Sequence, residues 1–231
     1  MKRYAFIDVA NTKGTAGMAL GFSVDWQKLI KMLKNDKWSC DKVFYYEGRM
    51  ETNKYDKRHK KLEKMGYTVR TKLTFLHKNR LKLIKYICEC QKENAFDKFK
   101  YLCTNCNKEK EITLNNGGSH PKANFDVEIA VDTLDYANSD TQIILFTGDG
   151  DFRFLAEKLI EKGATVIFIS SMRETIEERS KRFSTRLKDL IAKEETHAQQ
   201  QKIKSRARFL EMDNLRRLIE KENAAKRDVS E

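Results

Sequence analysis

Aspartates in this sequence follow stretches of apolar, strand-forming residues, and this placement suits metal-ion chemistry. Asp8 ends the strand-like run at residues 4–7, and Asp149 follows the run at residues 142–146. In an open α/β sheet, ligands bind beyond the carboxyl ends of the strands. We therefore expect these carboxylates to meet in one cleft. Asp126, at the start of an expected helix, is a candidate to point into the same cleft.

Carboxylates that share a cleft raise one another's pKa, and a divalent cation removes this repulsion. Mg²⁺ and Mn²⁺ are hard ions that take oxygen ligands and retain waters. Such an ion polarises a phosphoryl oxygen and lowers the pKa of an attacking water. No Ser-His-Asp or Cys-His arrangement is readable in the sequence. The chemistry indicated is metal-dependent phosphodiester hydrolysis, in which Asp151 is a candidate to bind a second ion or to activate water.

Each of these acids also has a purely structural interpretation. Asp8 could be a turn or cap residue, and Asp126 could stabilise a helix N-terminus. Asp149 and Asp151 could cap a helix after a tight turn at Gly150. The positions taken together favour a site, because the acids occur where this class of fold binds its ligands.

Strand-like and helix-like stretches alternate along most of the chain, which predicts an α/β fold with a parallel sheet and helices on both faces. We expect strands at residues 4–7, 42–46, 67–69, 142–146 and 165–169, and helices at residues 25–33, 55–65, 125–136 and 151–160. A glycine-bearing loop is expected after Asp8. After residue 173 the spacing of apolar residues predicts one or two long helices that dock on the domain, on a protein partner or on another copy of the chain.

Charge is concentrated in one part of the 231 residues, whose formal net charge is +12. Residues 51–110 hold 17 Lys and Arg against 7 Asp and Glu, a net of +10. A local positive field of this kind suits a polyanion such as nucleic acid or an anionic membrane, although a lysine-rich solvated surface is the alternative. No apolar run approaches the roughly 18 residues of a membrane helix. With no signal peptide apparent either, we expect a cytoplasmic protein that does not act at a membrane.

Three motifs resemble the NYN domain, a branch of the PIN-like nucleases. They read Phe6-Ile7-Asp8-x-x-Asn11, Lys122-x-x-x-Asp126-x-x-x-x-x-Asp132 and Thr147-Gly148-Asp149-Gly150-Asp151-Phe152. The resemblance covers about residues 1–190 without an insertion at 74–120. It implies a Rossmann-like sheet with strand order 3-2-1-4-5, a Mg²⁺ or Mn²⁺ site and endoribonuclease activity.

The resemblance also implies roles for single residues. Asp8, Asp126 and Asp149 match the metal-binding acids of the family. Asn11 matches the residue that orients the first acid or the phosphate. Asp132 matches a recurrent acid, but six residues beyond Asp126 it lies about 120° further around a helix, so its place on the same ion stays open. The family's first motif often has glycine after the aspartate, whereas this chain has Val9, which leaves the loop conformation open.

The insertion at residues 74–120 carries four of the five cysteines of the chain, Cys88, Cys90, Cys103 and Cys106. Four thiolates are the number for a closed tetrahedral Zn²⁺ site, so a structural zinc ion is predicted; ordinary reduced cysteines, disulfides and an iron–sulfur centre are the alternatives. Basic residues in and beside the insertion are candidates to hold RNA: Lys78, Arg80, Lys82, Lys85 and Lys122.

We therefore predict a nuclease domain at residues 1–190, with the basic cysteine-rich insertion at 74–120 and a charged helical extension at 191–231. The predicted function is metal-dependent endonucleolytic cleavage of RNA. The alternatives are a non-catalytic RNA-binding or adaptor module on the same fold, a DNA-directed nuclease, and an assembly protein that forms homo-oligomers or binds a protein partner through its C-terminal helices.

Overall fold

A computed structural model describes residues 1–50, 53–78, 84–87, 93–96, 98–113, 119–173 and 182–222. The chain divides into two compact units. The first comprises Met1–Leu73 and Asn124–Glu231, and the second comprises Thr74–Ala123.

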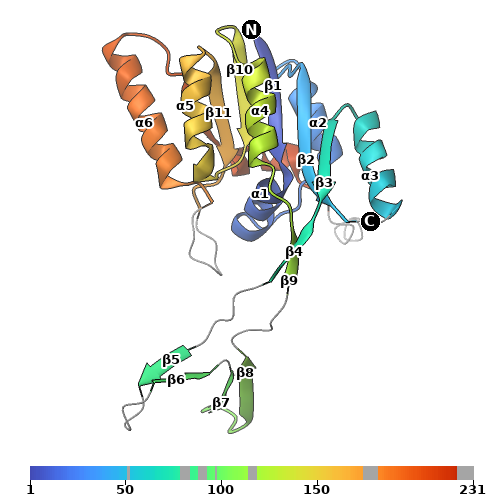
Figure 1. Cartoon of the computed structure of the whole chain (residues 1–231), viewed down its shortest axis with the longest axis vertical. Helices are drawn as coiled ribbons and strands as arrows, with labels where there is room; N and C mark the ends of the chain where they lie inside the picture. The colour runs from blue at the N-terminus through green and yellow to red at the C-terminus, as the bar shows by residue number, and fades with distance from the viewer. Residues whose placement is uncertain are drawn as a thin grey trace, which may run out of the picture. The chain divides into compact units, whose positions relative to one another are not determined.

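The first unit is built on a six-stranded parallel sheet with the strand order β12-β11-β10-β1-β2-β3 (Figure 1). Its strands are β1 (Lys2–Asp8), β2 (Lys42–Arg49), β3 (Thr68–Leu73), β10 (Thr141–Phe146), β11 (Thr165–Ser170) and β12 (Ala207–Glu211). Read from β3, this is the expected order 3-2-1-4-5 with a sixth strand added beyond β11. The central strands β1, β2 and β10 are mostly buried, as expected for apolar strands that are covered on both faces.

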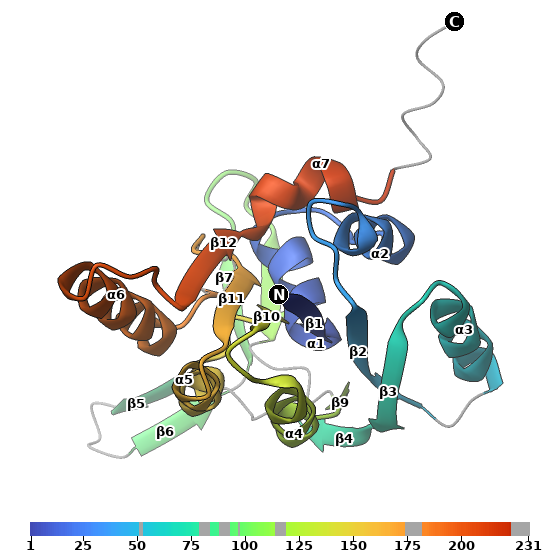
Figure 2. The same ribbon diagram turned by 90° about the horizontal axis from the view of Figure 1, so that it is seen from above.

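Helices cover both faces of this sheet (Figure 2). On one face lie α4 (Asp126–Tyr136), α5 (Arg153–Glu161) and α6 (Thr185–Gln200). On the other lie α1 (Val9–Gly14), α2 (Trp26–Lys34) and α7 (Arg216–Ile219), with α3 (Asn53–Lys64) beside β3. Three short helical turns complete the unit: η1 (Thr15–Ala19), η2 (Gly150–Phe152) and η3 (Met212–Leu215). An α/β fold with helices on both faces is thereby confirmed.

The core beneath α2 illustrates how the sequence forms these layers. Leu29, Ile30 and Leu33 recur at helical spacing and are buried, so one stripe of α2 faces the sheet. The helix begins after Asp25, whose carboxylate accepts hydrogen bonds from the backbone N–H groups of Gln27 and Lys28 at 2.9 and 3.1 Å. Capping fixes where the helix starts, and the apolar stripe fixes which face it buries.

Two segments differ from the prediction. The chain after Asp8 forms α1 and η1 rather than a loop, because the Asp8 carboxylate caps α1. The chain at Ala207–Glu211 forms β12 rather than a helix, and β12 pairs in parallel with β11. Its Phe209 ring lies 4.5 Å from that of Phe183, between ring centroids. The edge of β11 thus gains a strand, and this end of the chain packs on its own domain through β12 and α7.

The described residues of the second unit form three two-stranded antiparallel ribbons. They pair β4 (Phe75–Lys78) with β9 (Ser119–Lys122), β5 (Ile84–Ile87) with β6 (Glu93–Phe96), and β7 (Lys98–Leu102) with β8 (Glu109–Thr113). Across the part of the chain that the structure describes, no helix is long and apolar enough to cross a membrane.

Candidate active site

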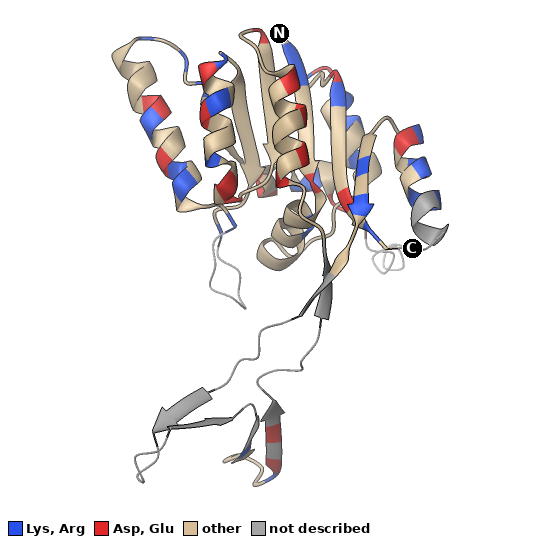
Figure 3. Ribbon diagram, viewed as in Figure 1, with Lys and Arg blue, Asp and Glu red and all other residues tan. Residues whose placement is uncertain are grey.

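The strand topology brings two of the predicted acids to one edge of the sheet. Strands β1 and β10 are parallel neighbours in which Ile7 pairs with Phe146, so both strands end at the same level. Asp8 is the last residue of β1, and Asp149 follows β10 within the turn that leads into η2. In Figure 3, red acidic segments lie at this lower edge, at the ends of α4, α5 and β2, and others lie higher along α4 and α5.

Asp126 follows the insertion in the sequence. It is the first residue of α4, and its backbone N–H donates to the Asn124 side chain at 2.8 Å. An acid in the first turn also interacts favourably with the helix dipole, so the structural interpretation of Asp126 applies as well. The negative charges of Asp126 and Asp149 both act on Asp8 and raise its pKa.

Asp8 has a strongly perturbed pKa. Its pKa is raised from 3.8 to about 6, chiefly because burial disfavours the charged form. The nearby charges of Asp126 and Asp149 raise the pKa further, while the backbone N–H groups of Asn11 and Ala10 lower it. The Asn11 N–H donates to Asp8 Oδ1 at 3.1 Å. An ionised Asp8 is therefore held at an energetic cost that a bound cation would remove.

Asn11 ties the ends of β1 and β10 together. Its side-chain oxygen accepts a hydrogen bond from the backbone N–H of Gly148 at 3.2 Å. Thr12 links the same strands, because its hydroxyl donates to the carbonyl oxygen of Asp8 at 2.6 Å and lies 3.3 Å from that of Phe146. A side chain at Gly148 cannot be accommodated, since a Cβ there would lie 1.8 Å from the backbone oxygen of Arg182. The turn that carries Asp149 is thus fixed against β1.

Asp149 and Asp151 lie on the exposed side of this turn. The backbone N–H of Asp151 donates to Asp149 Oδ1 at 3.0 Å, so Asp149 caps η2. Asp151 lies 3.7 Å from Arg186 Nη1, but both side chains are largely exposed and the pair contributes little stability. Beside them lies a hollow of about 520 Å³, lined in part by Phe154 and Arg153.

Asp132 has other partners. Its carboxylate accepts hydrogen bonds from the Tyr46 hydroxyl at 2.7 Å and from Arg70 Nε at 3.1 Å. Through these interactions Asp132 links α4 to strands β2 and β3, and Arg70 neutralises its charge. The structure thus places Asp132 in an ion pair, whereas Asp126 and Asp149 act on Asp8 through their charges.

Sequence reasoning missed an arginine that contacts α1 and η1. Arg182 crosses from the loop before α6 toward η1, where its Nη2 lies 2.6 Å from the Met18 sulfur. A Cβ at Gly14, in α1, would lie 3.0 Å from the same nitrogen. Its Nε is buried without a hydrogen-bond partner among the described residues. No sequence motif marks this arginine, which is one of many basic residues in its segment.

Sequence reasoning also missed a buried glutamate in the neighbouring strand. Glu47 Oε1 lies 2.6 Å from Lys13 Nζ and 3.2 Å from Arg58 Nη2. Its Oε2 lies 3.2 Å from the Tyr45 hydroxyl and 3.4 Å from His59 Nε2. Burial tends to raise the pKa of Glu47, but the hydrogen bonds and positive charges of Lys13 and Arg58 outweigh burial and lower it. The sequence signal that could have identified Glu47 is an acid that directly follows three aromatic residues in β2.

The donor set at the acids is compatible with a hard divalent ion. Asp8, Asp126 and Asp149 supply carboxylate oxygens only, and Mg²⁺ is commonly held by one or two carboxylates together with waters and substrate phosphates. Among the described residues, no group of three or more His, Cys, Asp or Glu side chains lies close enough together to hold a metal ion.

The remaining predicted residues belong to the second unit or border it. Cys103 and Cys106 lie in the turn between β7 and β8, and hydrogen bonds from the Asn105 and Cys106 backbone lower the pKa of the Cys103 thiol. Of the other predicted residues, Lys78, Lys85 and Lys122 lie on β4, β5 and β9, whereas Cys88, Cys90, Arg80 and Lys82 lie outside the described residues.

Comparisons with known proteins agree with this architecture. The family model described as NYN domain matches residues 3–190. A search among proteins of curated function finds no match. Among solved structures, the crystal structure of a protein of unknown function from Vibrio parahaemolyticus is similar, with a TM-score of 0.54 and 18% sequence identity over 92% of this chain and 93% of that chain. At this identity the likeness shows the fold alone.

Proposed function

Because the chain belongs to the NYN domain family, whose members are nuclease-like, we propose that it is a metal-dependent endoribonuclease. The observation that carries this proposal is the environment of Asp8, a partly buried carboxylate whose pKa is raised to about 6 and which has two further aspartates acting on it. Perturbed acids at the carboxyl edge of an α/β sheet are candidates for catalysis.

In this proposal Asp8, Asp126 and Asp149 hold the ion. A bound Mg²⁺ or Mn²⁺ would polarise a phosphoryl oxygen and lower the pKa of a water. Asn11 is a positioning residue, because it hydrogen-bonds Gly148 and its N–H reaches Asp8, so it sets the spacing of the two strand ends. Asp151, next to Asp149, is kept as a candidate to hold a second ion or to orient the attacking water.

Positive charge beside the acids supports a phosphodiester substrate, since carboxylates alone would repel phosphate. Arg182 reaches α1 and η1 at the same edge, and Arg186 lies next to Asp151. Phe154, whose side chain is 67% exposed, lines the hollow beside Asp151 and could stack on an unpaired base. We propose single-stranded RNA as the substrate, with Lys78, Arg80, Lys82, Lys85 and Lys122 as additional contacts to its backbone.

Cleavage of a labelled single-stranded RNA tests this proposal. Asp149→Asn keeps the oxygen that accepts from the Asp151 N–H and removes the charge, and we expect it to lower activity about 100-fold or more. Asp132→Asn is the matched control, because Asp132 is engaged by Tyr46 and Arg70, and activity should stay within about tenfold of the wild type. Chelator should abolish cleavage.

Three other outcomes would count against the proposal or refine it. Equal cleavage by the wild type and Asp149→Asn would contradict the assignment of the site. RNA binding with no cleavage in either ion would indicate a non-catalytic binding module. Faster cleavage of a DNA strand of the same sequence would replace RNA by DNA as the substrate.

We further propose that the second unit binds a structural zinc ion through Cys88, Cys90, Cys103 and Cys106. A Cys-x-x-Cys turn with backbone N–H groups directed at the Cys103 sulfur supports thiolate formation, which zinc binding requires. Purified protein should contain about one zinc ion per chain, and Cys103→Ser should lose most of it. Zinc content that is unchanged in Cys103→Ser would contradict this assignment.

A further inference from the structure

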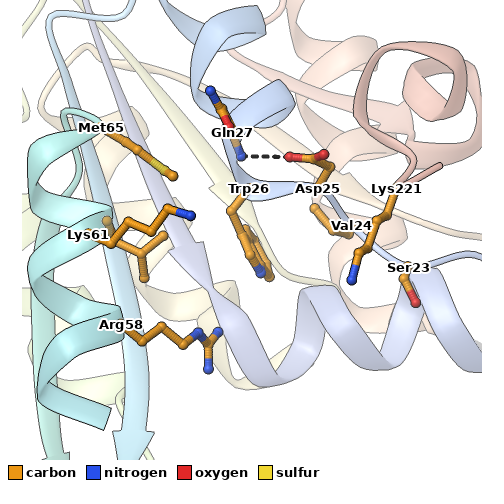
Figure 4. A pocket seen from close by; sticks show the side chains of 10 residues that line it. Ser23, Val24, Asp25, Trp26, Gln27, Arg58, Lys61, Met65 and Lys221 are labelled. Atoms are coloured by element: carbon orange, nitrogen blue, oxygen red, sulfur yellow. Dashed lines mark hydrogen bonds between the residues drawn. The ribbon is translucent and has the colours of Figure 1, made fainter. Parts of the chain in front are cut away.

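A second hollow lies apart from the acidic edge, between the start of α2 and one face of α3 (Figure 4). Its volume is about 500 Å³, which falls in the range of pockets that bind small molecules. None of the acids of the candidate active site lines it. Its walls come from residues 23–27, from α3 and from Lys221 after α7, so three separate parts of the first unit meet here.

An aromatic ring of fixed orientation lies at the centre of this hollow. Trp26 meets the Tyr45 ring edge-on, with 5.1 Å between ring centroids. Its backbone oxygen accepts a hydrogen bond from the Tyr67 hydroxyl at 2.7 Å. These contacts and packing against the apolar core hold the partly buried Trp26, which lines the hollow together with Met65 and the buried Leu62. The hollow therefore offers a flat, pre-oriented surface to a planar group.

Three basic side chains surround that ring, namely Arg58, Lys61 and Lys221 (Figure 4). Arg58 is held in place, because its Nη2 donates to the Tyr45 hydroxyl at 3.0 Å and to Glu47 at 3.2 Å. The one acid in the lining, Asp25, is engaged with the backbone N–H groups at the start of α2. Because Arg58 shares its charge with Glu47, the excess positive charge of the hollow comes from Lys61 and Lys221.

We propose that this hollow binds a single nucleotide, with its base against Trp26 and its phosphate among Lys61, Lys221 and Arg58. Stacking on an aromatic side chain accepts any base, and basic side chains supply the counter-charge for phosphate. A free nucleotide and one nucleotide of an RNA strand present the same chemistry. The site does not use Asp8, Asp126 or Asp149, so it does not depend on the proposed hydrolysis.

Tryptophan fluorescence measures this binding directly. The chain has two tryptophans, so Trp38→Phe in the full-length protein leaves Trp26 as the reporter. In chelator, adenosine 5′-monophosphate should change the fluorescence saturably and bind about tenfold more tightly than adenosine, which lacks the phosphate. Lys61→Glu should weaken the nucleotide about tenfold or more, because it reverses a charge in the lining.

Lys60→Glu is the matched control, because Lys60 is exposed, lies on the same helix and is not part of the lining. It should keep the affinity within about twofold of the parent protein. Asp149→Asn should also leave binding unchanged, which separates this site from the nuclease proposal. A short oligoribonucleotide, tested in the same way, distinguishes the two sources of the nucleotide. If Lys61→Glu weakens binding of the monophosphate selectively, the site takes a free nucleotide. If Lys61→Glu weakens binding of the oligonucleotide alone, the site takes one nucleotide of a strand. If neither probe distinguishes Lys61→Glu from Lys60→Glu, the proposal is overturned.

Discussion

Two carboxylates lie at the ends of neighbouring strands and experience opposite electrostatic environments. Asp8 ends β1, and Glu47 lies near the end of β2, one residue beyond the partner of Asp8 in the strand pairing. Lys13, Arg58 and His59 surround Glu47, and its pKa is lowered. Burial and two further aspartates act on Asp8, and its pKa is raised to about 6.

The difference shows what separates a structural acid from a candidate functional one. Burial raises the pKa of both groups, so burial alone does not identify a site. The neighbours decide the direction of the net shift. Glu47 receives its counter-charge from within the fold, whereas the aspartates near Asp8 add negative charge and favour a cation supplied from solution.

The largest stability effect expected from this comparison is that of Glu47→Gln. The change leaves Lys13 and Arg58 without their shared counter-charge and should lower the free energy of unfolding by about 2–3 kcal/mol at neutral pH. We place it below the range for fully buried pairs because the Lys13 and Arg58 side chains are 46% and 39% exposed.

The pH dependence of Glu47→Gln has a defined sign. Because the pKa of Glu47 is lowered in the folded state, its stabilising contribution is present above the ordinary value of 4.5 and is lost as the pH falls through the folded-state pKa. Urea unfolding at neutral pH and at about pH 3 measures both limits. A variant as stable as the wild type at neutral pH would remove the basis of the comparison.

In the presence of chelator, Asp8→Asn should raise the free energy of unfolding, by less than Glu47→Gln lowers it. The pKa of Asp8 is raised from 3.8 to about 6, so the ionised carboxylate destabilises the fold above this range. The variant should be about 1–2 kcal/mol more stable than the wild type at about pH 7.5, allowing for the partial exposure of Asp8. Well below pH 3.8, Asp8 is neutral in both the folded and the unfolded state, and the difference in stability should vanish.

Urea unfolding across this pH range checks the prediction for Asp8. Stability that decreases equally at every pH would mean that Asn disturbs the cap on α1 instead of relieving charge. If the prediction holds, Asp8→Asn should lose activity and gain stability, as happens where a functional site is maintained at the expense of stability.

The sequence predicted the sheet well because its signals are local. Strand-like runs of buried residues alternate with helices, and Asp8 and Asp149 follow such runs directly, so their meeting at one edge follows from the parallel arrangement of β1 and β10. By contrast, the apolar residues around Phe209 fit helical spacing, and only pairing with the edge of β11 makes this segment a strand.

Partners that are far apart in the sequence could not be predicted. Asp132 appears as one more acid on a helix, and its ion pair with Arg70 spans 62 positions. Arg182 is 164 positions from the methionine that its guanidinium contacts. The cluster around Glu47 joins α1, β2 and α3, three elements whose packing is known only from the fold. Such contacts depend on tertiary structure and leave no local pattern.

Binding of Mn²⁺ to the metal-free protein at about pH 7.5, measured by titration calorimetry, tests the central claim most directly. We predict saturable binding to the wild type, binding weakened about tenfold or more in Asp8→Asn, and binding within about twofold of the wild type in Glu47→Gln. These outcomes would establish that Asp8 takes its counter-charge from solution and that Glu47 takes it from the fold. Equal Mn²⁺ affinity of the wild type and Asp8→Asn would contradict the account.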